Sequence, residues 1–244
     1  MTDIVIRVPE PVAETLATLS SAVGGGVVLV GGWAVQCRLR MARRQIRPTS
    51  DLDVILGPAT RPARSALEAA SAIQDDPEHP CRISGLPLLV DLLAERPDAA
   101  VVGADDTVTD HDGLRLLVPP FASLLARATE PVRLEGEPSQ VIVCLPLAGA
   151  LFAGKTANIG LEHRPAEKVA SDGEDAVRLV EAFGALALAH DLRQATPGER
   201  RDVVARLEQI GGSALAAQAR VSGYDADPGR IRVVVDELLR ALRR

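Results

Sequence analysis

The sequence contains few aromatic residues, cysteines or histidines. These shortages limit which residues can build the core and which chemical roles the cysteines and histidines can have. Aromatic residues make up 2% of the 244 residues and apolar residues 47%, so Leu, Val and Ala must build the interior. The cysteines are odd in number, far apart and without a close metal-ligand spacing, which favours buried thiols over a redox role: Cys37, Cys81 and Cys144. The 4 histidines show no paired spacing, so we do not expect a zinc enzyme.

Long apolar runs are also missing. No stretch approaches the roughly 20 apolar residues that cross a bilayer, and the start MTDIVIRVPE lacks the basic-then-apolar order of a signal peptide. We therefore expect a cytoplasmic protein with no membrane partner. The net charge of -6 argues against adhesion to nucleic acid over the whole surface, so any such contact must be confined to one basic face.

The first half of the chain alternates between strand and helix patterns. Helical spacing over 12–22 ends at three glycines, and the β-branched run 27–30 reads as a buried strand. Gly31-Gly32 stops that strand before a helix-compatible segment over 33–41. The remaining expected elements are strands over 51–56, 88–93, 114–118 and 141–145, a helix over 61–75 and a loop over 77–87.

The second half is dominated by helical patterns. From about residue 147 the chain reads as helix, apart from loops near 162–173, 196–199 and 222–229. We therefore expect an α/β (α+β) protein, with a mixed sheet flanked by helices and then a helical carboxy-terminal domain. The expected domains are an α/β core over 1–118 and a mainly helical domain over 119–244 that completes the substrate cleft.

Two carboxylates stand one residue apart on the strand over 51–56. Side chains alternate along a strand, so Asp51 and Asp53 share a face, about 6 to 7 Å apart at Cα. Two-metal phosphoryl transfer needs oxygen ligands that hold ions ~3.5 to 4 Å apart. Acidic residues at a strand edge are also often merely solvated, so the pattern needs its context.

That context lies upstream, where a buried strand ends in Gly31-Gly32 before a helix. Glycines let backbone N–H groups approach phosphate oxygens, and a helix amino terminus adds positive potential. The alternative is a tight strand-to-helix turn with no ligand. A third carboxylate, Asp91, interrupts the apolar strand LPLLVDLLAE, where it would need a partner such as a metal if buried, or would face solvent at a strand edge.

Three segments in this order, LVGGWAV, RPTSDLDVIL and LLVDLLAE, resemble the polymerase-beta-type nucleotidyltransferase superfamily. Within it, the chain is most similar to abortive-infection (AbiEii-like) toxins of toxin-antitoxin systems. That similarity lies in R-x-T-x-D-x-D, here Arg47, Thr49, Asp51 and Asp53, and in a later lysine helix followed by acidic residues, here Lys155 and Asp175.

The resemblance implies specific roles. Asp51, Asp53 and Asp91 would bind Mg²⁺, with two ions expected, and Asp53 or Asp91 would help to deprotonate the acceptor. An NTP would be the substrate, contacted by Lys155, with Asp175 or Asp172 orienting that lysine or meeting the base and ribose. The expected nucleotide-binding set is Gly31, Gly32, Arg47, Thr49, Lys155 and Asp172. Lys155 is otherwise explained as a lysine lying along an amphipathic helix.

The resemblance also implies an acceptor and a partner, namely tRNA and a cognate antitoxin. Arg40, Arg43, Arg44 and Arg47 would line one face if their helix continued, and that face would either grip RNA or be solvated. Two other functions stay open. One is transfer to a small molecule such as an aminoglycoside, or to a protein hydroxyl. The other is a non-catalytic module that retains the fold and binds a partner.

Overall fold

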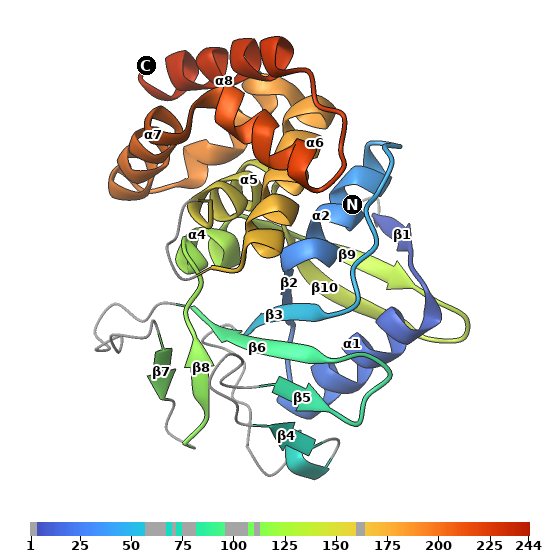
Figure 1. The fold of residues 1–244 in the computed structure, drawn as a ribbon. Helices are drawn as coiled ribbons and strands as arrows, with labels where there is room; N and C mark the ends of the chain where they lie inside the picture. Colours follow the sequence, from blue (N-terminus) through green and yellow to red (C-terminus); the bar gives the residue numbers. More distant parts are fainter. Residues whose placement is uncertain are drawn as a thin grey trace. The chain divides into compact units, whose positions relative to one another are not determined.

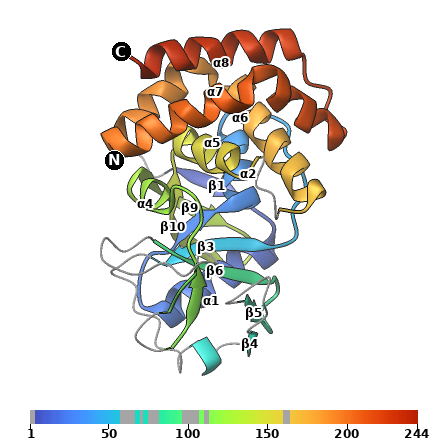
Figure 2. The same cartoon turned by 60° about the vertical axis from the view of Figure 1, so that its left-hand side comes forward.

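The computed structural model describes residues 4–56, 67–69, 72–74, 82–95, 107–109, 113–159 and 164–244. The chain divides into two compact units. Unit 1 comprises Met1–Ala34 and Pro48–Pro146, and unit 2 comprises Val35–Arg47 and Leu147–Arg244. Figures 1 and 2 show the sheet of unit 1 and the helices of unit 2 from two directions.

A mixed sheet forms the centre of unit 1 (Figure 1). Its main path runs β1-β9-β10-β2-β3-β6-β5-β4, while β8 pairs with β6 and β7 pairs with β8. The strands are β1 (Val5–Arg7), β2 (Val28–Val30), β3 (Leu52–Leu56), β4 (Ala72–Gln74), β5 (Arg82–Ser84), β6 (Val90–Ala94), β7 (Thr107–Thr109), β8 (Arg115–Leu117), β9 (Thr129–Glu135) and β10 (Gln140–Pro146). β2 and β3 are antiparallel, whereas β3 and β6 are parallel.

In the described part of unit 1, helices α1 and α4 contact this sheet. Helix α1 (Glu10–Val23) packs against β9 and β10 through its buried apolar face. It ends at Gly24, which takes the left-handed conformation (φ 69°) that glycine adopts without strain. Helix α4 (Ala122–Arg127) contacts β10 and β2.

The strand β2 leads directly into helix α2 (Gly31–Met41). All three residues of β2 are buried, as its β-branched run predicts for a strand covered on both faces. The helix begins at Gly31 itself, so the two glycines form its first turn instead of a separate loop. The division between the units falls inside this helix, after Ala34.

Unit 2 is a helical bundle. It contains the end of α2 together with α5 (Ala148–Ala157), α6 (Ala166–Asp191), the 3-10 turn η1 (Leu192–Gln194), α7 (Pro197–Val221) and α8 (Pro228–Leu242). Helix α6 packs against α5, α7 and α8. Gly184 and Gly211, with φ of 71° and 68°, kink α6 and α7. Thr196 and Asp227 cap the starts of α7 and α8 through side-chain oxygens.

The expected α/β class, a mixed sheet flanked by helices and followed by a helical region, is confirmed. The expected helix over 12–22 and strands over 27–30, 51–56, 88–93, 114–118 and 141–145 correspond to α1, β2, β3, β6, β8 and β10, and every end agrees within two residues. Among the described residues, none of the helices is both long enough and apolar enough to cross a membrane.

Other expectations need correction. The boundary expected at residue 118 falls inside unit 1, because β9 and β10 complete its sheet and the helical unit also takes residues 35–47. Of the expected helix over 61–75, residues 67–69 are helical but residues 72–74 form strand β4, and the expected loop over 77–87 contains strand β5. The loops expected at 162–173 and 196–199 end early, since α6 begins at Ala166 and α7 at Pro197. Residues 57–66, 70–71 and 75–81 lie outside the part of the chain that the structure describes.

Candidate functional site

Charged side chains form a row across three neighbouring strands of unit 1. Asp53 on β3 is the register partner of Asp91 on β6, and Asp91 is the register partner of Arg82 on β5. Residues directly opposite one another on paired strands point to the same face of a sheet. The row Asp53, Asp91, Arg82 therefore lies on one face, and Asp51, two residues before Asp53, belongs to the same face.

The glycine turn lies directly beside this row. Val30, the last residue of β2, pairs with Asp53, and Gly31 follows it with φ of 63°. A Cβ added at Gly31 would lie 1.8 Å from Asp53 Oδ2, so no other residue fits without moving the carboxylate. A Cβ at Gly32 would lie 3.0 Å from Thr49 Oγ1. The two glycines thus let the start of α2 approach Asp53 and Thr49.

Two of the three carboxylates, Asp51 and Asp91, accept hydrogen bonds from different neighbours. Asp51 accepts long hydrogen bonds of 3.4 Å from the hydroxyls of Thr49 and Ser50. Asp91 receives both arms of Arg82, with Nε 2.7 Å from Oδ1 and Nη2 2.9 Å from Oδ2. Within the described part of the chain, no three His, Cys, Asp or Glu side chains converge closely enough to hold a metal. The backbone register brings the acids to one face of the sheet, while Asp51 and Asp91 accept hydrogen bonds from different neighbours.

The donor set nevertheless suits magnesium. Carboxylate oxygens are the ligands that Mg²⁺ prefers, and the ion usually keeps several waters instead of a complete protein cage. The space that Gly31 leaves beside Asp53 would be filled by any Cβ. Asp51, Asp53 and Asp91 therefore offer carboxylate oxygens suited to the ion on one face of the sheet, and Asp91 is at the same time bound by Arg82.

Comparison with known proteins does not identify a family. No protein-family model and no curated protein matches the chain. Two solved structures are similar in part. One is the solution structure of the antibiotic-resistance factor ANT(2'')-Ia, with 16% identity, a TM-score of 0.41 and coverage of 82% of this chain and 94% of that one. The other is the crystal structure of ANT(2'')-Ia in complex with adenylyl-2''-tobramycin, with 15% identity, a TM-score of 0.41 and coverage of 78% and 95%.

This degree of similarity does not identify a function, so a functional assignment must rest on the residues of the site.

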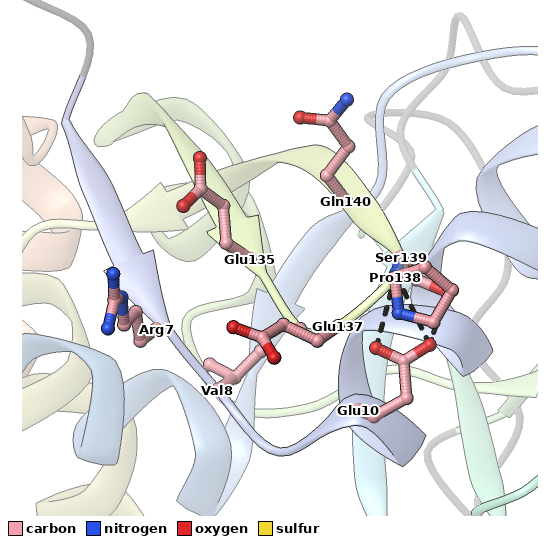
Figure 3. Close-up of a pocket in the computed structure, with 9 residues that line it drawn as sticks. Arg7, Val8, Glu10, Glu135, Glu137, Pro138, Ser139 and Gln140 are labelled. Atoms are coloured by element: carbon pink, nitrogen blue, oxygen red, sulfur yellow. Dashed lines mark hydrogen bonds between the residues drawn. The ribbon is translucent and has the colours of Figure 1, made fainter.

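A pocket elsewhere in unit 1 does not include the carboxylate row. It has a volume of about 530 Å³ and lies where the β9–β10 turn meets the start of α1 (Figure 3). Glu10 is engaged there in holding the turn, because its carboxylate accepts hydrogen bonds from the Ser139 hydroxyl at 2.5 Å and the Ser139 amide at 3.2 Å.

The remaining predicted residues form a separate charge cluster inside unit 2. Lys155 on α5 places its Nζ 2.9 Å from Asp172 Oδ1 and 2.8 Å from Asp175 Oδ2, both on α6. The lysine side chain is 11% exposed and the two aspartates 2% and 3%. Burial lowers the pKa of Lys155. The carboxylates of Asp175 and Asp172 together raise this pKa by a larger amount, so it lies above the ordinary value of lysine.

Two arginines complete this cluster. Arg47 contacts the Asp175 carboxylate at 3.3 and 3.4 Å, and Arg164 contacts that of Asp172 at 2.5 and 2.8 Å. Burial lowers the pKa of Arg47, but Asp175 raises it more, so the pKa lies above its usual value. Three cations against two carboxylates leave the cluster with one net positive charge. Lys155 and Arg47 are therefore ion-paired partners of Asp172 and Asp175 in this structure.

The arginine face expected over 40–47 does not form. Helix α2 ends at Met41, and Arg43 takes a left-handed conformation (φ 53°), so the four arginines do not share a helical face. Arg43 and Arg44 are exposed, whereas Arg47 turns to Asp175. Sequence reasoning also missed Arg82 and Arg164, which pair with the predicted aspartates.

Proposed function

We propose that this chain is a Mg²⁺-dependent nucleotidyltransferase that moves a nucleoside monophosphate from an NTP to an acceptor hydroxyl. The observation that carries the proposal is the in-register pair Asp53 and Asp91 beside a glycine that a larger residue could not replace. Carboxylates next to a helix amino terminus supply both metal ligands and phosphate-binding N–H groups. The resemblance of the three sequence segments to nucleotidyltransferases supports the same reaction class.

The chemistry divides among residues of unit 1. Asp51 and Asp53 would hold the ion, with Asp91 as the third ligand, and the ion would neutralise the triphosphate and activate the attacking oxygen. The N–H groups at the start of α2 orient the phosphates. The acceptor oxygen forms a bond to the α-phosphorus while the bond to the β-phosphate oxygen breaks, and pyrophosphate leaves. The hydroxyl proton passes to Asp53 or Asp91.

We propose a cationic small molecule with a free hydroxyl, of the aminoglycoside type, as the acceptor. Unit 1 carries 19 Asp and Glu against 8 Lys and Arg, a net charge of -11. Such a field concentrates cations and repels polyanions. The basic helical face that favoured RNA does not form, because α2 ends at Met41.

The second candidate acceptor is tRNA, and the charge of unit 2 supports it. Unit 2 carries 19 Lys and Arg against 14 Asp and Glu, a net charge of +5, and exposed arginines lie along α8. A polyanion bound there would lose affinity steeply with added salt. The toxin assignment implied by the sequence resemblance depends on this second acceptor.

Transfer of label decides between the acceptors. The protein, Mg²⁺ and α-³²P-labelled NTPs are incubated with a panel of aminoglycosides or with total tRNA, and products are separated by thin-layer chromatography and gel. We expect labelled aminoglycoside and released pyrophosphate with the wild type, and neither with Asp53→Asn. Labelled tRNA would instead establish the second candidate. Absence of pyrophosphate release with every acceptor and every NTP would overturn the reaction class.

A further inference from the structure

Asp91 lies between a like charge and an opposite charge on the same face of the sheet. Its register partner on β3 is Asp53, and its register partner on β5 is Arg82. Both members of the Arg82–Asp91 pair are largely buried, with side chains 17% and 13% exposed. Each Asp91 oxygen receives one guanidinium N–H, at 2.7 and 2.9 Å, which is the two-pronged geometry of strong charge-assisted bonds.

This arrangement explains why the acids share a face without converging. Two carboxylates on adjacent strands repel one another, while a guanidinium on the far side attracts the central one. Asp91 is accordingly drawn toward β5, and the described residues contain no three-acid cluster. Arg82 thus supplies, from within the fold, the positive charge that a divalent cation would otherwise supply.

We propose that Arg82 is a positioning residue that holds Asp91 away from Asp53 until a divalent cation competes for it. The inference rests on the proposed function, because it assumes that the cation binds at Asp51 and Asp53. Cation binding then requires Asp91 to exchange one positive partner for another. Arg82 therefore weakens cation binding while it stabilises the cation-free protein.

The consequence is an opposite effect of one substitution on two measurements. Without Arg82, the largely buried Asp91 loses the guanidinium that binds both of its oxygens, so the cation-free protein loses stability. The same change frees Asp91 to join the cation, so affinity for the cation rises. A residue with only a structural role would lower stability without raising that affinity.

The test measures Mn²⁺ binding to the full chain by isothermal titration calorimetry after removal of metals with EDTA, together with melting temperatures with and without Mn²⁺. The variants are Arg82→Gln, Arg82→Lys and Asp53→Asn. Arg127→Gln removes an equal charge from an exposed arginine on α4 of the same unit, which donates to the Ser123 carbonyl, and is the matched control.

We expect Arg82→Gln to lower the Mn²⁺ Kd by about tenfold, a typical size for one charge-assisted contact. Arg82→Lys keeps the charge but cannot make the two-pronged contact, so its Kd should fall between those of the wild type and Arg82→Gln. Arg127→Gln should match the wild type. If Arg82→Gln fails to fold, the test rests on the Mn²⁺ Kd of Arg82→Lys, which should be lower than that of the wild type.

The outcomes separate the two proposals. If the wild type binds Mn²⁺ and the Arg82 variants bind it equally or more weakly, Arg82 does not compete for Asp91 and the inference is overturned while the reaction class stands. If Asp53→Asn binds Mn²⁺ as the wild type does, or if neither the wild type nor any Arg82 variant binds it, the proposed metal site itself is wrong.

Discussion

The two units place their charged residues in contrasting settings. In unit 1 the carboxylates stand in a row across adjacent strands, and Asp51 and Asp53 are partly exposed. In unit 2, Asp172 and Asp175 are nearly inaccessible and are surrounded by cations from three segments of the chain. Charges that are buried and fully paired are expected to matter mainly for folding, whereas partly exposed acids beside a glycine turn are available for chemistry.

The same contrast holds for net charge, which is -11 for unit 1 and +5 for unit 2. The overall value of -6 hides this division. Whole-chain charge therefore says little about which acceptor approaches which unit. Substitution of Asp53 in unit 1 should change transfer with little effect on stability, whereas substitution of Lys155 in unit 2 should mainly lower stability.

The largest expected effect is that of Asp53→Asn in unit 1. Loss of a metal-binding carboxylate should reduce kcat for nucleotidyl transfer by roughly 10³-fold or more. The melting temperature should hardly change, because the side chain is partly exposed and the substitution is isosteric. Steady-state transfer assays and thermal unfolding measure the two quantities. Substantial activity in this variant would remove the distinction between the units.

Gly31→Ala should have the next largest effect. The alanine Cβ would collide with the Asp53 carboxylate, and φ of 63° adds strain of roughly 1–2 kcal/mol. Mn²⁺ binding and transfer should both fall. Gly24→Ala is the matched control, because Gly24 has φ of 69° with nothing within 4 Å of an added Cβ. Equal losses of transfer in both variants would show that strain alone, and not the displaced carboxylate, is responsible.

Lys155→Ala tests the unit 2 side of the comparison. Removal of the lysine leaves Asp172 and Asp175 short of a partner in the interior, so unfolding free energy should drop by about 3–5 kcal/mol. Lys168→Ala, at an exposed position on α6, should change it by no more than about 0.5 kcal/mol. Chemical denaturation measures both. A stable Lys155→Ala protein with a raised KM for NTP would instead support the nucleotide-binding role that the sequence resemblance implies.

The smallest effect concerns Tyr224, the sole tyrosine. Its ring lies 4.2 Å from the guanidinium carbon of Arg178, and its hydroxyl donates to Glu181. Burial and Glu181 raise the pKa of Tyr224 to about 12. The folded state therefore keeps the proton more tightly than the unfolded state, so this contribution to stability is complete below pH 10 and is lost as the pH rises toward 12.

Absorbance titration at 295 nm of the folded protein reports this ionisation directly. The midpoint should lie well above 10.0, the ordinary pKa of tyrosine, and Glu181→Gln should lower it because the neighbouring negative charge is gone. A midpoint at the ordinary value would mean that this end of unit 2 is open to solvent and that its polar network is not maintained.

Sequence patterns were sufficient for local features. The alternation in Asp51-Leu52-Asp53, the glycine pair and the lone acid of an apolar strand are each encoded within a few residues, and β3, α2 and β6 formed where expected. The strand β9 was not expected, because Pro131 and several charges mask the inward positions Val132 and Leu134. The alternate burial of residues in β9 is apparent only in the folded sheet, where β1 and β10 pair with it on either side.

Pairing between distant residues could not be read from the sequence. Arg47 and Asp175 are 128 residues apart, and no local spacing predicts their contact. Arg82 lies in a segment rich in turn residues, where a loop was expected, and its pairing with Asp91 depends on the antiparallel register of β5 and β6. The sequence pattern thus predicts the acidic residues themselves, whereas their ion-pair partners can be identified only in the tertiary structure.

Helix α2 belongs to both units, and the chain crosses between them after Ala34, after Arg47 and after Pro146. No single cut can therefore release either unit whole. A fragment that stops at Pro146 would still carry the Arg47 segment but would lack the helix that holds Asp175, and a fragment that starts at Leu147 would have Asp175 without Arg47. Proteolysis between the halves should therefore yield pieces that remain associated or unfold, instead of two independent domains.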